Sequence, residues 1–251
     1  MAGMSISEME EMARKCRIEI CKMTHRAQAG HPGGSLSEID ILCGLYGHRL
    51  RVKPGDPDWE DRDRFILSKG HASPGMYAVL AEMGFISHED LKSYRVKGGV
   101  CQGHVDMKWC PGVDFSAGSL GMGLSFGMGC AVAAKLDGSS RNAYVMVGDG
   151  EIQEGSVWEA AMAATHHELG NLKLFVDCNG IQNDDFCEAQ MRMFDIPAKW
   201  NAFGWAVKVI DGHDMTSIVE AIDWMDSIQD KPTVVIANTI KAVSYTHLRA
   251  H

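Results

Sequence analysis

Two polar residues stand at the ends of two predicted strands, and their side chains are suited to hold a divalent cation. Asp149 follows one short apolar run, and Asn179 follows the next. Carboxylate and amide oxygens suit Mg²⁺ or Ca²⁺, above all where the phosphates of a ligand complete the coordination shell. Gly148 and Gly150 flank the aspartate, and glycine allows the backbone to approach a phosphate closely. These residues together predict a site for a metal and a phosphorylated ligand.

The first of these turns also has a plainer structural interpretation. A Gly-Asp-Gly tripeptide occurs at ordinary strand ends, where the aspartate caps the helix that follows. Taken by itself, the tripeptide favours that interpretation. A second strand that ends at Asn179, one strand–helix–strand unit later, favours the cation site instead.

Three histidines lie in turns and could bind anions or transfer protons. His31 lies between glycine and proline in the phrase GHPGGS, which favours a ligand group over an ordinary surface histidine. His71 follows a predicted strand in SKGHAS, where an anion would be held, but a capping or packing role is equally open. His104 lies between Cys101 and Cys110, and this spacing is too wide to favour a zinc site.

The elements that would position these residues follow from hydrophobic periodicity. The apolar runs at 143–147 and 172–176 are typical of buried parallel strands, and residues 154–168 between them predict a helix. In a parallel sheet, ligands bind outside the carboxyl ends of the strands, where Asp149 and Asn179 would lie. Further strands are expected at 65–67, 205–210 and 233–239.

The helices are predicted by their caps and apolar stripes. Residues 7–28 form an amphipathic pattern, with Ser7 as its cap and Glu10 completing a capping box. Its apolar stripe is expected in the core: Met12, Cys16, Ile20 and Met23. Ser37 would cap a second helix that ends near His48. Further helices are expected up to Met83, from Ser87 to Tyr94, at 200–203 and at 215–228, with a polar, mobile loop at 184–197 and a turn-and-cap role for the phrase DGHD at 211–214.

Residues 116–134 are unusually rich in glycine for a helical stretch. Glycines stand at positions 118, 121, 123, 127 and 129. Glycine costs about 1 kcal/mol in a helix interior, so its repeated use indicates close packing against a cofactor or another helix.

Composition limits the class of protein. The chain has 251 residues, 45% of them hydrophobic and 23% charged, which fits one large globular domain. A net charge of −9 argues against nucleic-acid binding, and no apolar run is long enough for a membrane span. The N-terminus lacks a signal-peptide pattern, and the eight cysteines include no CxxC pair, so we expect a cytoplasmic protein with free thiols.

These phrases, in this order, resemble the transketolase-like enzymes that bind thiamine diphosphate, over about residues 5–241. The resemblance implies an α/β fold with a mainly parallel sheet flanked by helices. It implies that Asp149, Asn179 and the backbone carbonyl of Ile181 hold a divalent metal, Mg²⁺ or Ca²⁺, which in turn holds the cofactor's diphosphate. It assigns further cofactor contacts to His71, Gly118, Leu120, Gly148, Gly150 and Asn179. It places His31 and His104 on the substrate side, where they would orient or shuttle protons to substrate oxygens.

The order of the phrases resembles the N-terminal half of a split transketolase. The implied reaction transfers a two-carbon ketol unit from a ketose phosphate to an aldose. The alternatives are an α-subunit of a 2-oxo-acid dehydrogenase, a deoxyxylulose-phosphate synthase, and a non-catalytic subunit that only binds cofactor. Val105 and Met122 depart from the usual Pro and Gln of the family, which weakens the assignments next to them.

The resemblance also implies a partner. In transketolases, a glutamate of a second domain activates the cofactor's pyrimidine ring, so we expect a heterotetramer with a separately encoded C-terminal subunit. Glu154 and Glu159 would lie at a subunit interface. The residues 242–251 do not match the family and resemble a cloning or assembly scar, so the predicted domain is 1–241.

Overall fold

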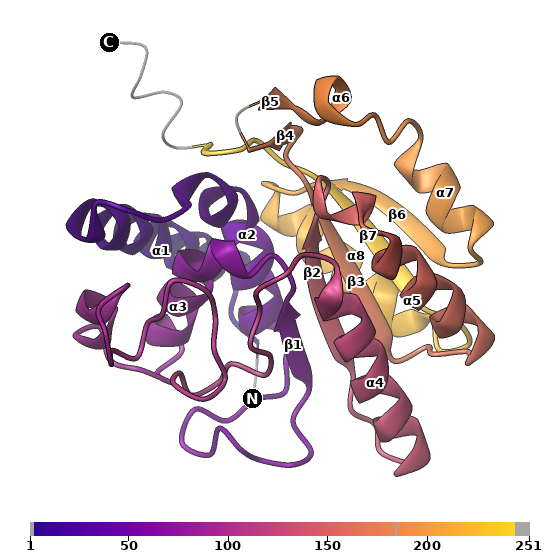
Figure 1. The fold of residues 1–251 in the computed structure, drawn as a ribbon. Coiled ribbons are helices and arrows are strands. Elements are labelled where there is room, and N and C mark those ends of the chain that lie inside the picture. The colour runs from indigo at the N-terminus through magenta and orange to yellow at the C-terminus, as the bar shows by residue number, and fades with distance from the viewer. Residues whose placement is uncertain (1–2, 184, 244–251) are drawn as a thin grey trace.

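A five-stranded parallel sheet forms the centre of the protein (Figure 1). The computed structural model describes residues 3–183 and 185–243. The strand order is β1-β2-β3-β7-β6. The strands are β1 (Arg64–Leu67), β2 (Ala143–Gly148), β3 (Leu172–Cys178), β6 (Ala206–Asp211) and β7 (Thr233–Asn238). Gly148 pairs with Asp177, and Asp177 pairs with Ala237, so the carboxyl ends of the three central strands lie level at one edge. The expected α/β fold is confirmed.

Helices cover both faces of this sheet. One face packs against α2 (Pro32–His48), α3 (Ser73–Glu82) and α8 (Met215–Ser227), with α1 (Ile6–Ala27) outside them. The other face packs against α4 (Met122–Leu136), α5 (Gly155–His166) and α7 (Ile196–Ala202). Figure 1 shows α1, α2 and α3 gathered on one side and α4 and α5 on the other. Successive strand residues point to opposite faces, so Met146 joins the first core and Val145 the second.

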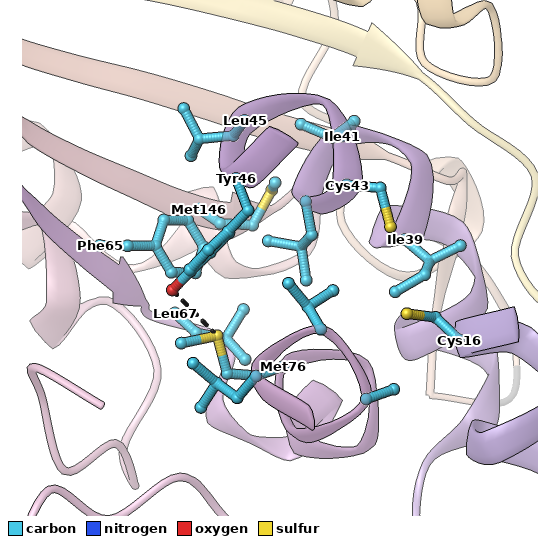
Figure 2. Close-up of a cluster of buried hydrophobic side chains, with 14 of the residues drawn as sticks. Cys16, Ile39, Ile41, Cys43, Leu45, Tyr46, Phe65, Leu67, Met76 and Met146 are labelled. Atoms are coloured by element: carbon cyan, nitrogen blue, oxygen red, sulfur yellow. Dashed lines mark hydrogen bonds between the residues drawn. The ribbon is translucent and has the colours of Figure 1, made fainter. Parts of the chain in front are cut away.

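The helix α2 is buried on all sides. Every residue from Gly34 to Gly47 is buried, as expected for a helix that is apolar all round. Figure 2 shows Tyr46 of this helix beside Phe65 of β1, with its hydroxyl 3.8 Å from the sulfur of Met76. The same view shows Cys43 close to Cys16, a member of the apolar stripe of α1 that the sequence predicts to be buried. The prediction for that stripe is confirmed.

Two predicted helix caps were wrong. Ser5, not Ser7, caps α1: its hydroxyl accepts from the Glu8 amide at 3.3 Å, and the Glu8 carboxylate accepts from the Ser5 amide at 2.8 Å. The pattern allowed a two-residue shift because serine and glutamate recur at the same spacing. Ser37 lies within α2, which starts at Pro32, because proline is well suited to the first helical turn.

The region expected to be a mobile loop contains regular structure. Two short strands, β4 (Ile181–Gln182) and β5 (Asp185–Phe186), form an antiparallel hairpin, and α6 (Cys187–Gln190) follows. Shorter 3-10 helices cover Gly70–Ala72, Asp90–Ser93 and Glu151–Gln153. Asp214 caps α8 by accepting from Thr216 and Ser217, as expected for the DGHD phrase.

The glycines of α4 divide into two groups. A β-carbon on Gly123 would lie 2.4 Å from Ser68, and one on Gly127 would lie 2.4 Å from Val145, so these positions need glycine. Gly118 and Gly129 meet no neighbour within 4 Å, so the expected close packing is wrong for them within the described chain. The close neighbours are strand residues, not another helix. Among the described residues, none of the helices combines the length and hydrophobicity that crossing a membrane requires.

Candidate cofactor and metal site

Asp149 lies where β2 leaves the sheet, and its carboxylate joins the two strand ends. Oδ1 accepts from the Gly150 amide at 2.8 Å, and Oδ2 accepts from the Gly180 amide at 2.7 Å. The alternative in which Asp149 caps the next helix is therefore wrong, because a 3-10 turn intervenes and α5 begins only at Gly155. Burial raises the pKa of the carboxyl, although these two amide bonds oppose the shift.

Asn179 and Ile181 lie in the turn after β3. The Asn179 Oδ1 accepts from the Ile181 amide at 3.2 Å. The Ile181 carbonyl accepts from the ammonium group of Lys241 at 3.2 Å, and the same ammonium group donates to the Asn183 carbonyl at 2.9 Å. A positive charge therefore already faces one of the implied metal ligands.

The residues at these two turns fit the implied metal. A carboxylate, an amide oxygen and a backbone carbonyl form a set of hard oxygen donors, which suits Mg²⁺ or Ca²⁺. Within the described residues, no three His, Cys, Asp or Glu side chains gather as metal ligands. Asp149 would be the one charged protein ligand, so the phosphates of a bound ligand would have to supply much of the coordination.

A buried ionic network lies beneath the turns. The Lys69 ammonium donates to Asp177 at 2.6 Å and lies 2.8 Å from Glu38. Burial opposes the charge on Lys69, but the two carboxylates outweigh it and raise its pKa. The same ammonium group lowers the pKa of the Asp177 carboxyl in spite of its burial. Burial raises the pKa of Glu38 to about 8, so Glu38 holds a proton at neutral pH and the remaining pair is balanced.

The three predicted histidines come together at the same edge. The rings of His31 and His71 meet edge to face, with their centroids 5.3 Å apart. Burial lowers the pKa of His71 to about 4, and Lys69 adds to this shift. Burial also lowers the pKa of His31, with the charge of His104 contributing, and burial lowers that of His104, with Arg95 contributing. His31 precedes α2 without capping it through its side chain, and no side-chain cap is present at α3 either, so the capping role considered for His71 is wrong.

Glu151 connects the turn after β2 to the glycine-rich segment before α4. It is buried, and its carboxylate accepts from the Gly121 amide at 2.9 Å, the Gly148 amide at 3.1 Å and the Ser68 hydroxyl. This connection brings the segment that contains Gly118 and Leu120 next to the Asp149 turn. Both residues are exposed there, and Leu120 is 36% exposed.

Sequence reasoning missed several residues of this site: Ser37, Lys69, Glu151, Asp177 and Lys241. Lys69 and Glu151 each stand next to a phrase that was singled out, and a charged residue between apolar strands and glycines was an available signal. Ser37 was assigned to a cap, and its contacts with residues far along the chain could not be read from local spacing.

Comparison with known proteins gives the family. The family model described as "Transketolase, thiamine diphosphate binding domain" matches residues 8–248. The chain is 41% identical to the "6-deoxy-6-sulfo-D-fructose transketolase subunit SqwG" of Clostridium sp. (strain MSTE9), over 84% of this chain and 77% of that protein. It is 38% identical to one of the named subunits of the apulose-4-phosphate transketolase of Phocaeicola vulgatus, over 96% of this chain and 86% of that protein.

Solved transketolases have the same fold. The structure from Campylobacter jejuni superposes with a TM-score of 0.90 at 33% identity, covering 95% of this chain and 38% of that one. A Pichia stipitis transketolase mutant gives a TM-score of 0.90 at 32% identity, covering 95% and 37%. The chain therefore spans a little over a third of those enzymes. It belongs to the transketolase family and contains that family's thiamine diphosphate binding domain, as the sequence phrases indicated.

Proposed function

We propose that this chain is the cofactor-binding subunit of a two-chain transketolase, which transfers a two-carbon ketol unit from a ketose phosphate to an aldose. The observation that carries the proposal is the meeting of two kinds of residue at one sheet edge. Oxygen donors at the ends of β2 and β3 suit a metal and a diphosphate, and histidines of lowered pKa face the same edge. The relatives' names contain two different sugars, so we propose the donor only at the level of a ketose phosphate.

The proposed metal site consists of Asp149, Asn179 and the Ile181 carbonyl, with Mg²⁺ as the preferred ion. The metal would hold the diphosphate, while Gly148 and Gly150 allow the backbone to approach it. Bound thiamine diphosphate would supply the nucleophilic carbon and the electron sink that ketol transfer requires. Gly118 and Leu120 are proposed to contact the rings of the cofactor.

The histidines are proposed to act in their neutral forms. His71, whose pKa is about 4, would donate a hydrogen bond to the diphosphate without adding charge. The lowered pKa values of His31 and His104 favour the neutral ring at pH 7, which can accept a proton from a substrate oxygen and return it. Such positioned groups contribute about 10²–10⁴-fold to a rate.

A separate partner chain is part of the proposal. Relatives named as subunits of apulose-4-phosphate transketolases match over 86% and 89% of their own length, which supports a two-chain enzyme with this chain as one part. The outer surface of α4 and α5 supports a docking role, because it exposes Met122, Phe126 and Met162 together with Glu159. We propose a heterotetramer with two copies of each chain. All eight cysteines are free, which supports the proposed reducing, cytoplasmic setting.

Two measurements test the proposal. Calorimetry with thiamine diphosphate and Mg²⁺ is expected to lose its binding signal in Asp149→Ala, because the diphosphate would face an uncompensated charge in a half-buried site. Asp185→Ala is the matched control, because this exposed aspartate lies on the neighbouring hairpin and should leave affinity unchanged. Ketol transfer should require the partner chain. Cofactor binding without transfer in the reconstituted complex would favour a regulatory role, and unchanged affinity in Asp149→Ala would refute the metal site.

A further inference from the structure

The side-chain amide of Asn179 is held at both of its ends. Its oxygen accepts from the Ile181 amide, as described above. Its nitrogen donates to the Ser37 hydroxyl at 3.3 Å and to the Asp177 Oδ2 at 3.3 Å. An asparagine amide can be turned around with little change of shape, so hydrogen-bond partners decide which end faces a ligand.

Both partners of the amide nitrogen act as acceptors. The Ser37 hydroxyl donates its proton to Asp177 Oδ2 at 2.6 Å, which leaves only its oxygen lone pairs to face Asn179. Asp177 is an ionised carboxylate, because Lys69 donates to the same Oδ2 at 2.6 Å and the Thr239 hydroxyl donates to Oδ1. A reversed amide would place its oxygen against two acceptors and leave its own nitrogen without them.

Burial makes this preference strong. Ser37 and Asp177 are both completely buried, and the Lys69 ammonium lies among them rather than in solvent. Electrostatic repulsion between acceptor oxygens is screened little in such surroundings, and an unpaired buried donor costs about 1–3 kcal/mol. The two acceptors come from α2 and β3, so the arrangement also ties the GHPGGS helix to the turn that carries the metal ligand.

We propose that Ser37 and Asp177 are positioning residues that fix the Asn179 amide with its oxygen directed toward the bound cation. The inference rests on the proposed function, because it takes Asn179 as a metal ligand. Lys69 serves the same end indirectly, since it keeps Asp177 in place as an acceptor. Metal ligands elsewhere depend on such outer partners, whose loss typically costs about 10–100-fold in metal affinity.

The test measures Mn²⁺ binding by electron paramagnetic resonance on the full chain in the presence of thiamine diphosphate. Ser37→Ala is expected to weaken Mn²⁺ binding by about 10-fold or more, because the amide loses an acceptor and Asp177 loses a donor. Ser35→Ala is the matched control. Ser35 is equally buried in the same helix, but its hydroxyl bonds to the His31 and Ala72 carbonyls and not to the metal turn. Thermal unfolding of both variants shows whether stability changes equally.

A double-mutant cycle with Asn179→Ala separates positioning from a general structural effect. If Ser37 acts through the amide, Ser37→Ala will have no further effect on Mn²⁺ affinity once Asn179 is alanine. Equal Mn²⁺ affinities for Ser37→Ala and Ser35→Ala would overturn the inference, as would an undiminished effect of Ser37→Ala in the Asn179→Ala background.

The cycle also distinguishes this inference from the proposed function. If Asn179→Ala weakens Mn²⁺ binding while Ser37→Ala does not, only the positioning role fails. If Asn179→Ala leaves Mn²⁺ affinity unchanged, or the wild-type chain takes up no Mn²⁺, the metal site itself is wrong and both conclusions fall.

Discussion

The two faces of the sheet are covered by helices of similar hydrophobicity but of very different burial. On one face, α2 is enclosed from Gly34 to Gly47 by α1, α3, α8 and the sheet. On the other face, α4 is just as apolar in sequence, yet Met122 is 48% exposed and Phe126 is 38% exposed. Beside them, Met162 of α5 is 54% exposed. The closed face completes its core within this chain, whereas the outer side of α4 and α5 has apolar surface left for the proposed partner.

This difference teaches that an apolar helix can serve two purposes. The side of α4 that faces the sheet uses Gly123 and Gly127 for close approach, and its outer side presents larger apolar groups. If the outer side is an interface, substitutions on the two faces should have separable effects, one on the stability of the chain and the other on assembly.

The largest effect is expected in the closed face. Leu42 in α2 is completely buried, so Leu42→Ala should lower the free energy of unfolding by about 2–5 kcal/mol through lost burial and the cavity left behind. Urea denaturation of the isolated chain measures this. A loss below about 1 kcal/mol would mean that the closed face relaxes easily and the comparison does not hold.

Acid should destabilise the closed face through His71. Its pKa is lowered from 6.5 to about 4, so the folded state prefers the neutral ring. The stability from this group is fully present above pH 6.5 and is lost as the pH falls through about 4, by at most about 3 kcal/mol. Unfolding measured across this range should depend less on pH in His71→Gln. Identical profiles for both proteins would show that the ring is not held neutral by burial.

The two faces of α4 can be compared directly with one substitution at two glycines. Gly127→Ala should destabilise the isolated chain by about 1–3 kcal/mol, because its methyl group would lie 2.4 Å from Val145. Gly129→Ala faces open space and should stabilise the isolated chain by about 0.5–1 kcal/mol through helix propensity. Differential scanning calorimetry of the two variants measures both signs. Equal destabilisation would contradict an open outer side.

The smallest effect on the chain itself is expected at Met162. Met162→Lys should change the stability of the isolated chain by no more than about 0.5 kcal/mol, since the side chain is half exposed. It should weaken association with the partner by about 10-fold, because a charge would have to be desolvated at the interface. Ile18→Lys on the outside of α1 is the control, with a residue that is 41% exposed. Sedimentation showing equal association for both variants would remove α5 from the interface.

Much of the fold and part of the site could be predicted from the sequence because they depend on local patterns. Short apolar runs gave the strands, and their parallel arrangement placed the residues that follow β2 and β3 at one edge. His31, His71 and His104 were found because glycine and proline mark the turns that carry them. The family resemblance followed from the order of these phrases and is confirmed. Cap positions were less certain, because Ser5 and Ser7 each have a glutamate three residues on.

Only the tertiary structure decided which polar groups meet beneath those turns. Ser37 and Asp177 are 140 positions apart, and Lys69 and Asp177 are 108 apart, yet each pair is joined at 2.6 Å. Strand register and the seating of α2 on the sheet bring them together, and neither leaves a periodic signal in the chain. The exposure of α4 is of the same kind, because apolar sequence gives the hydrophobicity of a helix but not how many of its sides are covered. The sequence by itself determined the elements and the donors at their ends, because those depend on neighbours a few residues away. The orientation of Asn179 and the open outer side of α4 were decided by contacts between distant segments.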